Sequence, residues 1–333
     1  MTAAFVDALA AGDEAAATAV AMARVDAGAD PVDVMVDLVV PAQREVGRRW
    51  ACGEWSVAQE HAATAISEAV VAALAARMAP PAATKGHLVV ACAEREWHSL
   101  PARIVAHALR RGGWRTTYLG ACTPPGQLVR FLDETGADAV AVSCSVAAAL
   151  PAARRLIEAV RESGRPVLAG GPAFGSDPSR ALALGASGWA ADARTAADVA
   201  DRLIPAATGP AEPLRHAGID EHLEVVLRFA DLRGQVLARW ADPPDELAAD
   251  LAGDLAGDLA GDLVDHALHS LAASLLAGDR AMLTDADRWL VDLFTARGHD
   301  PALAPRLWLA VRDTVGELLP LARADLAPLA TRR

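Results

Sequence analysis

The fold is decided by a stretch that reads HLVVACA over residues 87–93 and EREWHSLP over residues 94–101. The first part is an uninterrupted apolar run with the length of a fully buried strand. The second part is a polar loop that leads into a helix-length segment at 101–112. A buried strand followed directly by a loop and a helix is typical of a β/α unit in a parallel sheet.

The same alternation continues downstream of this first unit. Further short apolar runs lie at 115–119, 137–143, 166–169 and 188–191, and helix-length segments lie at 125–135, 149–163, 178–185 and 195–204. Right-handed crossovers should wind such strands into a sheet that helices cover on both faces. We therefore predict a doubly wound, flavodoxin-like domain with a parallel five-stranded sheet over residues 86–205.

The regions on both sides of this domain look helical. Residues 2–79 are alanine-rich, with a helix start at Asp30-Pro31 and a capping box at Ser56, which predicts a four-helix bundle over 1–80. Residues 214–330 contain no convincing strand, so an all-α domain is predicted there. Within it an Asp-Leu-Ala-Gly repeat starts at 250 and predicts a marginal helix or a flexible connector. The predicted fold class is multi-domain α and α/β.

Composition excludes several classes of function. The chain of 333 residues is 53% hydrophobic and carries a net charge of −12, which argues against a nucleic-acid partner because phosphates require clustered cations. No charge-free run approaches the ~18 apolar residues of a membrane span, and the first residues lack the basic region of a signal peptide. The 4 cysteines have no metal-type spacing and indicate reduced thiols, as in a cytoplasmic protein.

The loop after the first strand carries the sharpest candidate for chemistry. Ligands of doubly wound domains bind outside the carboxyl ends of the strands, where the strand order reverses. His98 lies in this loop, and Ser143 and Ser145 lie at the end of the third strand. An imidazole there can coordinate a metal when its second nitrogen is oriented, and Glu96 is near enough in sequence to orient it. The alternative is that His98 is an ordinary exposed loop histidine.

Two further strand ends favour a large, flat ligand at the same edge. Leu119-Gly120 closes the second predicted strand, and Gly170-Gly171 follows the fourth. Glycine permits a close approach between the backbone and a ligand. The alternative is that these glycines serve only turns.

A second constellation lies in the predicted bundle. Trp50 ends one helix, and Glu60-His61 follows in the first turns of the next. An indole beside a carboxylate and an imidazole could cover one face of a flat ligand. The alternative is that Trp50 packs between helices while Glu60 offsets the helix dipole.

Together these features resemble cobalamin-binding modules, which pair a four-helix bundle with a doubly wound domain. The usual loop of that family is Asp-x-His-x-x-Gly, and this chain has Glu96-x-His98-x-x-Pro101. The resemblance implies that His98 is the lower axial ligand of cobalt, with Glu96 as its partner. It also implies a cobalamin-binding set that includes the slot for the benzimidazole tail: Trp97, Ser99, Leu100, Leu119, Gly120, Ser143, Ser145, Gly170 and Gly171.

The spacing of Trp50, Glu60 and His61 is similar to that of CarH-type light receptors. In that family the bundle holds the upper face of adenosylcobalamin, and light breaks the upper cobalt–carbon bond. The resemblance implies that light changes the upper ligand and the packing of the bundle. CarH-type receptors carry a histidine directly after the tryptophan, which captures cobalt after photolysis. Here that position is Ala51, so the sequence does not specify the photoproduct.

The order of bundle, doubly wound domain and C-terminal helices resembles photocobilins, which add a globin-like domain that binds a bilin. Residues 287–290 and 297–299 are similar to late-helix patterns of such globins. The resemblance implies a bilin such as biliverdin, bound non-covalently because no cysteine follows Cys144. Candidate bilin-binding residues are His222, Arg228, Arg233, Trp240, His266, His269, Arg288 and Trp289. The alternative is a helical domain for dimerisation or partner docking.

The sequence thus predicts a cytoplasmic, cobalamin-dependent light sensor rather than an enzyme. Its downstream signalling partner is unknown, and a homodimer is expected from the helical faces. Two other interpretations stay open. One is a corrinoid methyl carrier that serves a methyltransferase, and the other is a light-blind cobalamin sensor whose helical tail docks a partner.

Overall fold

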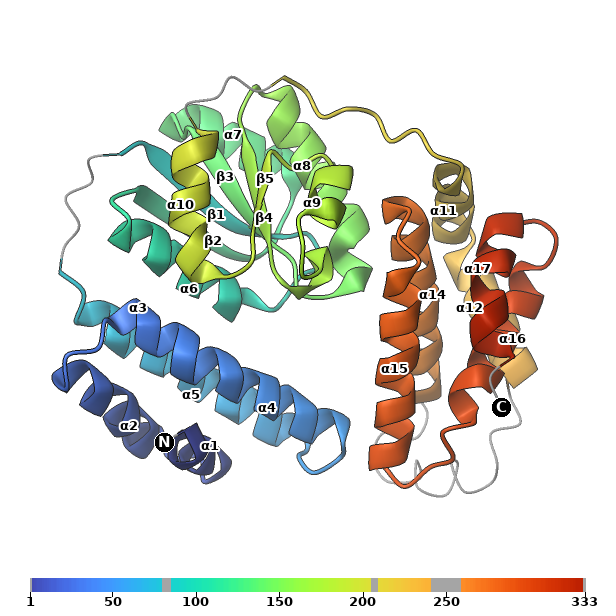
Figure 1. Cartoon of the computed structure of the whole chain (residues 1–333), viewed down its shortest axis with the longest axis horizontal. Helices are drawn as coiled ribbons and strands as arrows, with labels where there is room; N and C mark the ends of the chain where they lie inside the picture. The colour runs from blue at the N-terminus through green and yellow to red at the C-terminus, as the bar shows by residue number, and fades with distance from the viewer. Residues whose placement is uncertain (1, 80–84, 205–208, 241–258, 332–333) are drawn as a thin grey trace. The chain divides into compact units, whose positions relative to one another are not determined.

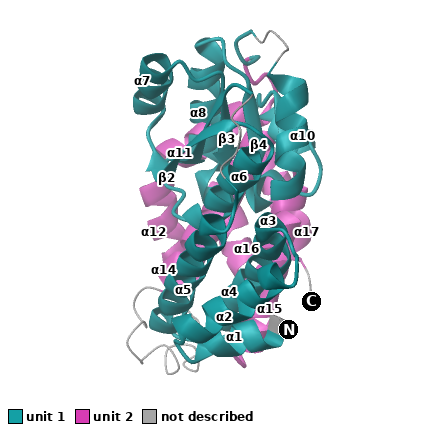
Figure 2. Cartoon of the chain, turned by 90° about the vertical axis from the view of Figure 1, so that its left-hand side faces the viewer, with its two compact units in different colours: residues 1–212 teal, residues 213–333 magenta. Residues whose placement is uncertain are grey.

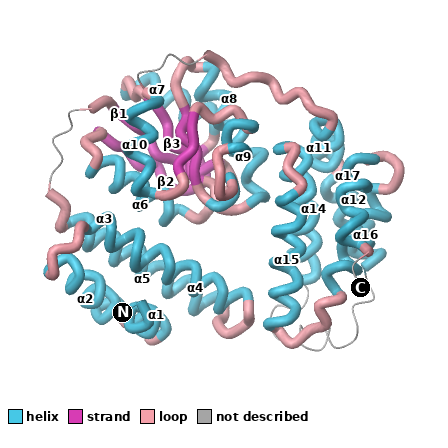
Figure 3. The backbone as a smooth tube through the Cα atoms, viewed as in Figure 1, coloured by secondary structure: helices cyan, strands magenta, loops and turns pink. Residues whose placement is uncertain are grey.

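The computed structural model describes residues 2–79, 85–204, 209–240 and 259–331. The chain divides into two compact units, Met1–Glu212 and Pro213–Arg333 (Figures 1 and 2). The first unit contains a helical bundle and a parallel sheet with its helices, and the second contains only helices among its described residues (Figure 3).

The bundle is made of helices whose ends follow from local capping. Its elements are α1 (Thr2–Ala10), α2 (Glu14–Asp26), α3 (Pro31–Val34), the turn η1 (Met35–Val39), α4 (Val40–Ala51) and α5 (Val57–Ala76). Gly12, with φ of 67°, separates α1 from α2, and Asp13 caps α2. The predicted proline start after Asp30 and the capping box of Ser56 and Gln59 are both present.

The long helix formed by α3, η1 and α4 contains a π-helical turn at Met35–Val39. The backbone N–H of Val40 donates to the carbonyl of Met35, five residues back. Pro41 follows directly, and a proline has no N–H to donate and crowds the preceding turn. The wider π turn accommodates this proline and rotates α4 relative to a regular α-helix.

The sheet confirms the predicted doubly wound, flavodoxin-like fold. Its strands are β1 (His87–Ala93), β2 (Arg115–Thr123), β3 (Ala139–Ser143), β4 (Val167–Gly170) and β5 (Gly188–Ala190). They are parallel and run in the order β2-β1-β3-β4-β5. The reversal of strand order therefore lies between β1 and β3, where sequence reasoning placed the ligand edge.

The second strand is longer than the predicted run at 115–119. It continues to Thr123 through register shifts opposite Val90 and Ala91. Gly120 and Cys122 both have positive φ, so the strand is bulged there rather than ended. The expectation that Leu119-Gly120 closes the strand is therefore wrong, because the bulge lets pairing resume beyond it.

Helices cover both faces of the sheet. They are α6 (Ser99–Arg111), α7 (Pro125–Thr135), α8 (Leu150–Glu162), α9 (Ser179–Ala183) and α10 (Ala193–Leu203), with short 3-10 turns η2 (Ala147–Ala149) and η3 (Pro172–Phe174). Helices α6 and α10 share a core with alternate side chains of the strands. Helix α8 contacts β1, β3 and β4, and α7 packs beside it.

Helix α6 also joins the sheet to the bundle. Its residues Ala102, Ala106 and Leu109 face the sheet core, whereas Leu100 and Ile104 belong to the apolar core of the bundle. A helix that is apolar on two faces is buried between two layers. The bundle and the sheet are therefore held together by a continuous apolar interface.

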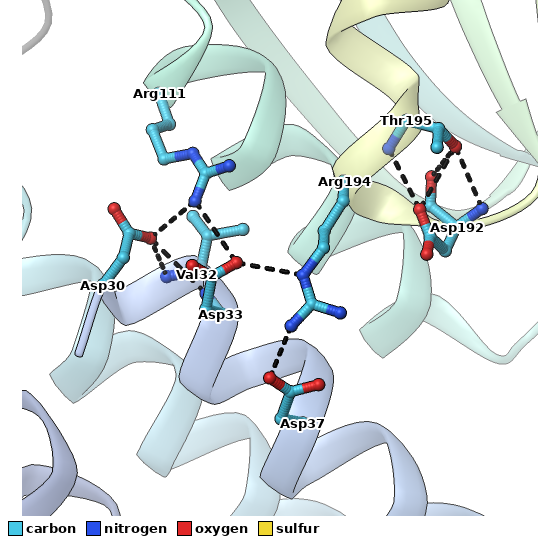
Figure 4. Close-up of polar contacts among 8 residues, drawn as sticks. All are labelled: Asp30, Val32, Asp33, Asp37, Arg111, Asp192, Arg194 and Thr195. Atoms are coloured by element: carbon cyan, nitrogen blue, oxygen red, sulfur yellow. Dashed lines mark hydrogen bonds and ion pairs between the residues drawn. The ribbon is translucent and has the colours of Figure 1, made fainter.

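A cluster of ion pairs supplements this interface at one end of α6 (Figure 4). Arg111 pairs with Asp30 at 2.8 Å and with Asp33 at 3.4 Å. Arg194, at the start of α10, pairs with Asp33 at 3.0 Å and with Asp37. We call these five residues the interdomain ion-pair cluster. It ties α3 and η1 of the bundle to both helices on that face of the sheet.

The second unit is a packed set of helices. They are α11 (Gly218–Leu227), α12 (Phe229–Trp240), α14 (Leu259–Ala277), α15 (Ala281–Ala296), α16 (Leu303–Val315) and α17 (Pro320–Ala330). The buried Glu221 carboxylate accepts the N–H groups of Leu321 and Ala322 and so caps α17.

The predicted Asp-Leu-Ala-Gly repeat starts at 250, and its residues 250–258 lie outside the described part of the chain. Its last residues, 259–261, belong to α14. No described helix has the length and apolarity needed to cross a membrane.

Candidate functional site

The buried carboxylate of Glu96 organises the ligand edge of the sheet. Glu96 is completely buried in the loop after β1. One of its oxygens accepts hydrogen bonds from Nδ1 of His98 at 2.6 Å and from the backbone N–H of His98 at 2.8 Å. The other accepts the backbone N–H groups of Ser145 and Val146, the latter at 3.1 Å. Glu96 therefore locks the loops after β1 and β3 against each other.

These contacts also fix how His98 can act. Because Nδ1 faces a carboxylate, it carries the proton, and Nε2 is the nitrogen that can offer a lone pair. The side chain is 61% exposed, and Nε2 has no hydrogen-bond partner among the residues that the structure describes. The structure thus brings Glu96 and His98 together in the arrangement that a metal-ligating histidine requires.

The charges of this pair are coupled. Burial alone would raise the pKa of Glu96, but hydrogen bonds from His98 and from the backbone of Ser145 outweigh it and hold that pKa below its usual value. The hydrogen bond to Glu96 raises the pKa of His98 against the effect of burial, and the negative charge of Glu60 adds to the rise. Glu60 on α5 is thus near enough to His98 to act on it electrostatically.

The ends of β3 and β4 and the loops that follow them pack tightly beside this pair. We call their residues Ser143, Ser145, Gly170 and Gly171 the floor of the site. Gly171 has φ of 106°, and a Cβ there would lie 2.4 Å from the carbonyl oxygen of Cys144, so only glycine fits. Ser143 is buried at the end of β3, where it pairs with Gly170 on β4. The predicted residues Ser143, Ser145, Gly170 and Gly171 therefore do lie together.

An unsatisfied polar atom lies within this floor. The Oγ atom of Ser145 is buried and has no hydrogen-bond partner among the described residues. A buried hydroxyl without a partner costs about 1–3 kcal/mol. A polar group on a bound cofactor would satisfy it. Together with the single oriented imidazole of His98, this orphaned hydroxyl fits a cofactor that carries its own metal and a polar tail.

The other predicted residues of this edge have mixed surroundings. Trp97 is 73% exposed beside His98, and Gly120 lies in the β2 bulge. Leu100 is buried in the core shared with the bundle. Ser99 opens α6, where its carbonyl accepts the hydroxyl of Tyr118 at 3.0 Å and its own hydroxyl lies 3.4 Å from Glu68. Pro101, which replaces the glycine of the resembled loop, lies in the first turn of α6.

The bundle presents the second predicted constellation near the turn between α4 and α5. Trp50 is 39% exposed on α4, and His61 is 74% exposed on α5. Oε2 of Glu60 lies 3.5 Å from Nε2 of His61, and Oε1 of Glu60 accepts the hydroxyl of Thr64 at 3.0 Å. The tryptophan buried in the bundle core is Trp55, at 8% exposure.

Sequence reasoning missed several contributors to these two constellations. Val146 donates through its backbone, which carries no signal in the sequence. Cys122 donates its backbone N–H to the carbonyl of Glu96 from the β2 bulge. The hydroxyl of Thr64 on α5 lies within hydrogen-bond distance of both Glu60 and Gln43, the latter on α4. For Thr64 and Gln43, the sequence signal was a polar residue at a position where the helical periodicity predicts an inward-facing apolar one.

In the second unit, two predicted histidines come together with aromatic side chains. The ring centroids of His266 and Trp289 are 4.4 Å apart, as are those of His269 and Phe229. Nε2 of His266 is buried with no hydrogen-bond partner among the described residues. Burial lowers the pKa of His266 to about 4, so this imidazole is neutral at pH 7.

The remaining candidates in this unit do not join that cluster through any hydrogen bond or ion pair described. Arg228 pairs with Glu224 and Asp231, Arg233 with Asp265, and Arg288 with Asp285. Nδ1 of the buried His222 lies 2.7 Å from the carbonyl of Ala272. Trp240 is buried at the end of α12. The three arginines are thus engaged in surface ion pairs.

Two parts of the chain match known protein families. Residues 86–198 match one family described as "B12 binding domain", and residues 2–75 match a second family with the same description. The chain is also 31% identical over 147 residues to the HTH-type transcriptional repressor CarH of Myxococcus xanthus. That match covers 43% of this chain and 48% of CarH, so the chain spans about half the length of this curated relative.

A solved structure shows the same fold. The monomethylamine corrinoid protein of Methanosarcina barkeri superposes with a TM-score of 0.51 at 18% identity, over 59% of this chain and 94% of that protein. The bundle and the doubly wound domain of this chain therefore form a cobalamin-binding module.

Proposed function

We propose that the chain is a cobalamin-dependent light sensor that binds adenosylcobalamin with His98 as the lower ligand of cobalt. The observation that carries the proposal is the buried Glu96 carboxylate, which orients His98 and leaves Nε2 facing outward. The matches to two B12 binding domains and the likeness to CarH support it. Ser143, Ser145, Gly170 and Gly171 hold the cofactor tail in this proposal.

When bound, adenosylcobalamin supplies a cobalt–carbon bond that light can break. The residues of the bundle have a different task from those of the sheet. Trp50, Glu60 and His61, which are all accessible near the turn between α4 and α5, would cover the upper ligand and exclude water from it. These three residues would make contacts to the upper ligand in only one state of the bundle, and such a differential contact would bias how the bundle packs on the sheet.

The test uses the full chain, loaded with adenosylcobalamin in the dark and then illuminated. We expect the visible spectrum to change on illumination, and an unchanged spectrum would refute the claim of light sensing. His98→Ala should weaken cobalamin binding and abolish the spectrum of the histidine-ligated form. His107→Ala, on helix α6 that follows His98, is the control and should bind cobalamin as wild type does. Unaltered binding in His98→Ala removes His98 from the site.

We propose in addition that the second unit binds a bilin non-covalently, in a globin-like arrangement of its helices. The support is the contact of the His266 ring with Trp289 and of the His269 ring with Phe229, which offers aromatic walls and, at His266, one imidazole nitrogen without a partner among the described residues. A far-red absorption band that co-purifies after incubation with biliverdin is the expected result. His266→Ala should remove that band and leave the cobalamin spectrum intact, and a chain that never retains biliverdin would contradict this part.

Two other functions share the cobalamin module. The fold likeness to a monomethylamine corrinoid protein keeps a methyl carrier for a methyltransferase in view. Such a carrier would accept a methyl group and prefer methylcobalamin, whereas the light sensor prefers adenosylcobalamin. A light-blind sensor whose helical tail docks a partner would show the same oligomeric state and the same partner affinity in darkness and in light.

A further inference from the structure

A chain of hydrogen bonds runs between α4 and α5 behind Glu60. The hydroxyl of Thr64 lies 3.0 Å from Oε1 of Glu60 and 3.2 Å from Oε1 of Gln43. The amide nitrogen of Gln43 donates to the hydroxyl of Ser67 at 2.7 Å. The completely buried Ser67 donates in turn to the carbonyl of Ala63 at 2.9 Å. A continuous polar path between α4 and α5 therefore ends on Glu60.

The direction of each hydrogen bond in this path is fixed by counting protons. Ser67 has one hydroxyl proton, which goes to the carbonyl of Ala63, so its oxygen must accept from Gln43. The amide nitrogen of Gln43 therefore points to Ser67, and its oxygen points to Thr64. Thr64 has a single proton and faces two groups that can only accept, the Gln43 amide oxygen and the Glu60 carboxylate.

We propose that Thr64 is a positioning residue that holds Glu60 toward the upper face of the cofactor, and that Gln43 is its alternate acceptor. This inference rests on the proposed function, in which Glu60 covers the upper ligand. The charged carboxylate is the stronger acceptor, so Thr64 donates to Glu60 while that side chain is in place. When Glu60 moves, a rotation of one hydroxyl transfers the hydrogen bond to Gln43.

The alternate acceptor changes what it costs to move Glu60. Thr64 is half-buried, and a hydroxyl in such a position destabilises the folded state when it loses its protein acceptor. With Gln43 beside it, Thr64 is satisfied in both arrangements, so Glu60 can leave the upper face without an orphaned group behind it. The bundle thus has two discrete, satisfied arrangements that an upper ligand can bias.

Two substitutions should act in opposite directions. Thr64→Val keeps the shape of the side chain but removes the hydroxyl, so Glu60 loses its tether. Gln43→Leu removes the alternate acceptor, so Thr64 should bind Glu60 more exclusively. Ser67 keeps its carbonyl partner in that variant. Thr64→Val should therefore weaken the preference for adenosylcobalamin, and Gln43→Leu should preserve or strengthen it.

The experiment titrates the full chain with adenosylcobalamin and with methylcobalamin in the dark. Thr64→Val should weaken adenosylcobalamin binding about tenfold, the lower end of what one charge-assisted hydrogen bond contributes, and leave methylcobalamin binding within about twofold. Thr64→Ser should restore wild-type selectivity. Thr135→Val is the matched control, because its hydroxyl bonds only to the carbonyl of Phe131 on α7. Thr64→Ala provides the same test if the valine variant does not fold.

If Thr64 had only a structural role, its loss would weaken the binding of both cobalamins equally. The ratio of the two dissociation constants therefore distinguishes a positioning role from a structural one. In a Glu60→Ala background, Thr64→Val should have no further effect on selectivity, since the two residues act as one unit. Three results would overturn the inference: equal loss for both cobalamins, no loss for either, or a failure of serine to rescue. None of them would contradict the proposal that the chain binds cobalamin. A wild-type chain that binds no cobalamin would overturn both this inference and the proposed function.

Discussion

Within the cobalamin-binding module, the two halves of the proposed site differ in how firmly their carboxylates are held. Glu96 is completely buried and accepts hydrogen bonds from Nδ1 and the backbone of His98 and from the backbone of Ser145 and Val146. Glu60 is partly exposed and is held by one hydroxyl, beside a His61 that is 74% exposed. The lower half is prebuilt around one nitrogen atom, whereas the upper half can rearrange.

This difference matches what each half would have to do. A lower ligand must keep one geometry, which requires an oriented imidazole and a supporting shell. An upper face that changes when its ligand leaves needs two arrangements of similar free energy. Substitutions in each half test whether the two carboxylates differ in this way.

The largest expected effect is the loss of the Glu96 carboxylate. Glu96→Ala removes a completely buried carboxylate and leaves the half-buried N–H groups of Ser145 and Val146 without their acceptor, and it should lower the free energy of unfolding by about 3 kcal/mol. Glu60→Ala should cost about 1 kcal/mol or less. Urea-induced unfolding of the cofactor-free chain measures both. Glu94→Ala, which removes an exposed ion pair with Arg155, is the control and should have no measurable effect. Equal costs for Glu96 and Glu60 would contradict the comparison.

The second effect concerns the floor of the lower half. Gly171→Ala should destabilise the chain by about 3 kcal/mol, because it adds a clash with the Cys144 carbonyl to the strain of a positive φ. Gly136→Ala is the matched control: its φ is also positive, at 62°, but its Cβ would meet open space. That variant should cost about 1 kcal/mol, the strain alone. Unfolding curves that coincide for the two variants would show that the close approach at Gly171 has no energetic weight.

A third prediction uses pH. The raised pKa of His98 and the lowered pKa of Glu96 mean that their ion pair stabilises the cofactor-free chain fully between about 4.5 and 6.5, the ordinary values of the two groups. That stability is lost as pH rises through the raised pKa of His98, and also as pH falls through the lowered pKa of Glu96.

Cofactor binding should show the opposite dependence on pH. A proton and cobalt compete for Nε2 of His98, so cobalamin affinity should fall as pH drops below the raised pKa of His98. Glu96→Gln removes the charge that raises this pKa, and the fall should then begin at a lower pH. Spectral titrations from pH 8 to about pH 5 measure both curves. An affinity that is independent of pH over this range would exclude a histidine ligand with a raised pKa.

The smallest effect is expected at the interdomain ion-pair cluster. Arg111→Ala combined with Arg194→Ala should cost about 1 kcal/mol at low salt, because the paired side chains are partly exposed and the bundle is held mainly by the apolar face of α6. Unfolding in about 1 M salt should show almost no difference from wild type, since salt screens exposed pairs. A large, salt-independent loss would mean that the ion pairs, rather than the core at Leu100 and Ile104, join the bundle to the sheet.

Much of the first unit was predictable because its signals are local. Each buried strand is an uninterrupted apolar run, and the predicted starts at Asp30-Pro31 and Ser56 are the observed caps. The β2 extension was missed because pairing resumes after a bulge, in which the non-glycine residue Cys122 adopts a positive φ. The π turn before Pro41 was also missed, because a proline in the sequence suggests that a helix ends there and does not indicate that the helix continues through a wider turn.

The site was predictable only in part. Glu96 and His98 are two residues apart, so their contact follows from local reach. The contacts of Glu96 with Ser145 and Val146 depend on the packing of two loops and involve backbone groups without a sequence signal. The link from Glu60 through Thr64 to Gln43 depends on how α4 and α5 face each other after the π turn, which no local pattern encodes.

The most direct test of the central claim is electron paramagnetic resonance of the full chain loaded with the cobalt(II) form of cobalamin. The chain would be prepared with ordinary histidine and with histidine labelled with nitrogen-15. Coordination by Nε2 of His98 predicts that the splitting of the cobalt lines changes from three to two components on labelling, and that His98→Ala abolishes this change. A three-component splitting that persists in the labelled protein would show that the cofactor keeps its own benzimidazole ligand, and it would contradict the account.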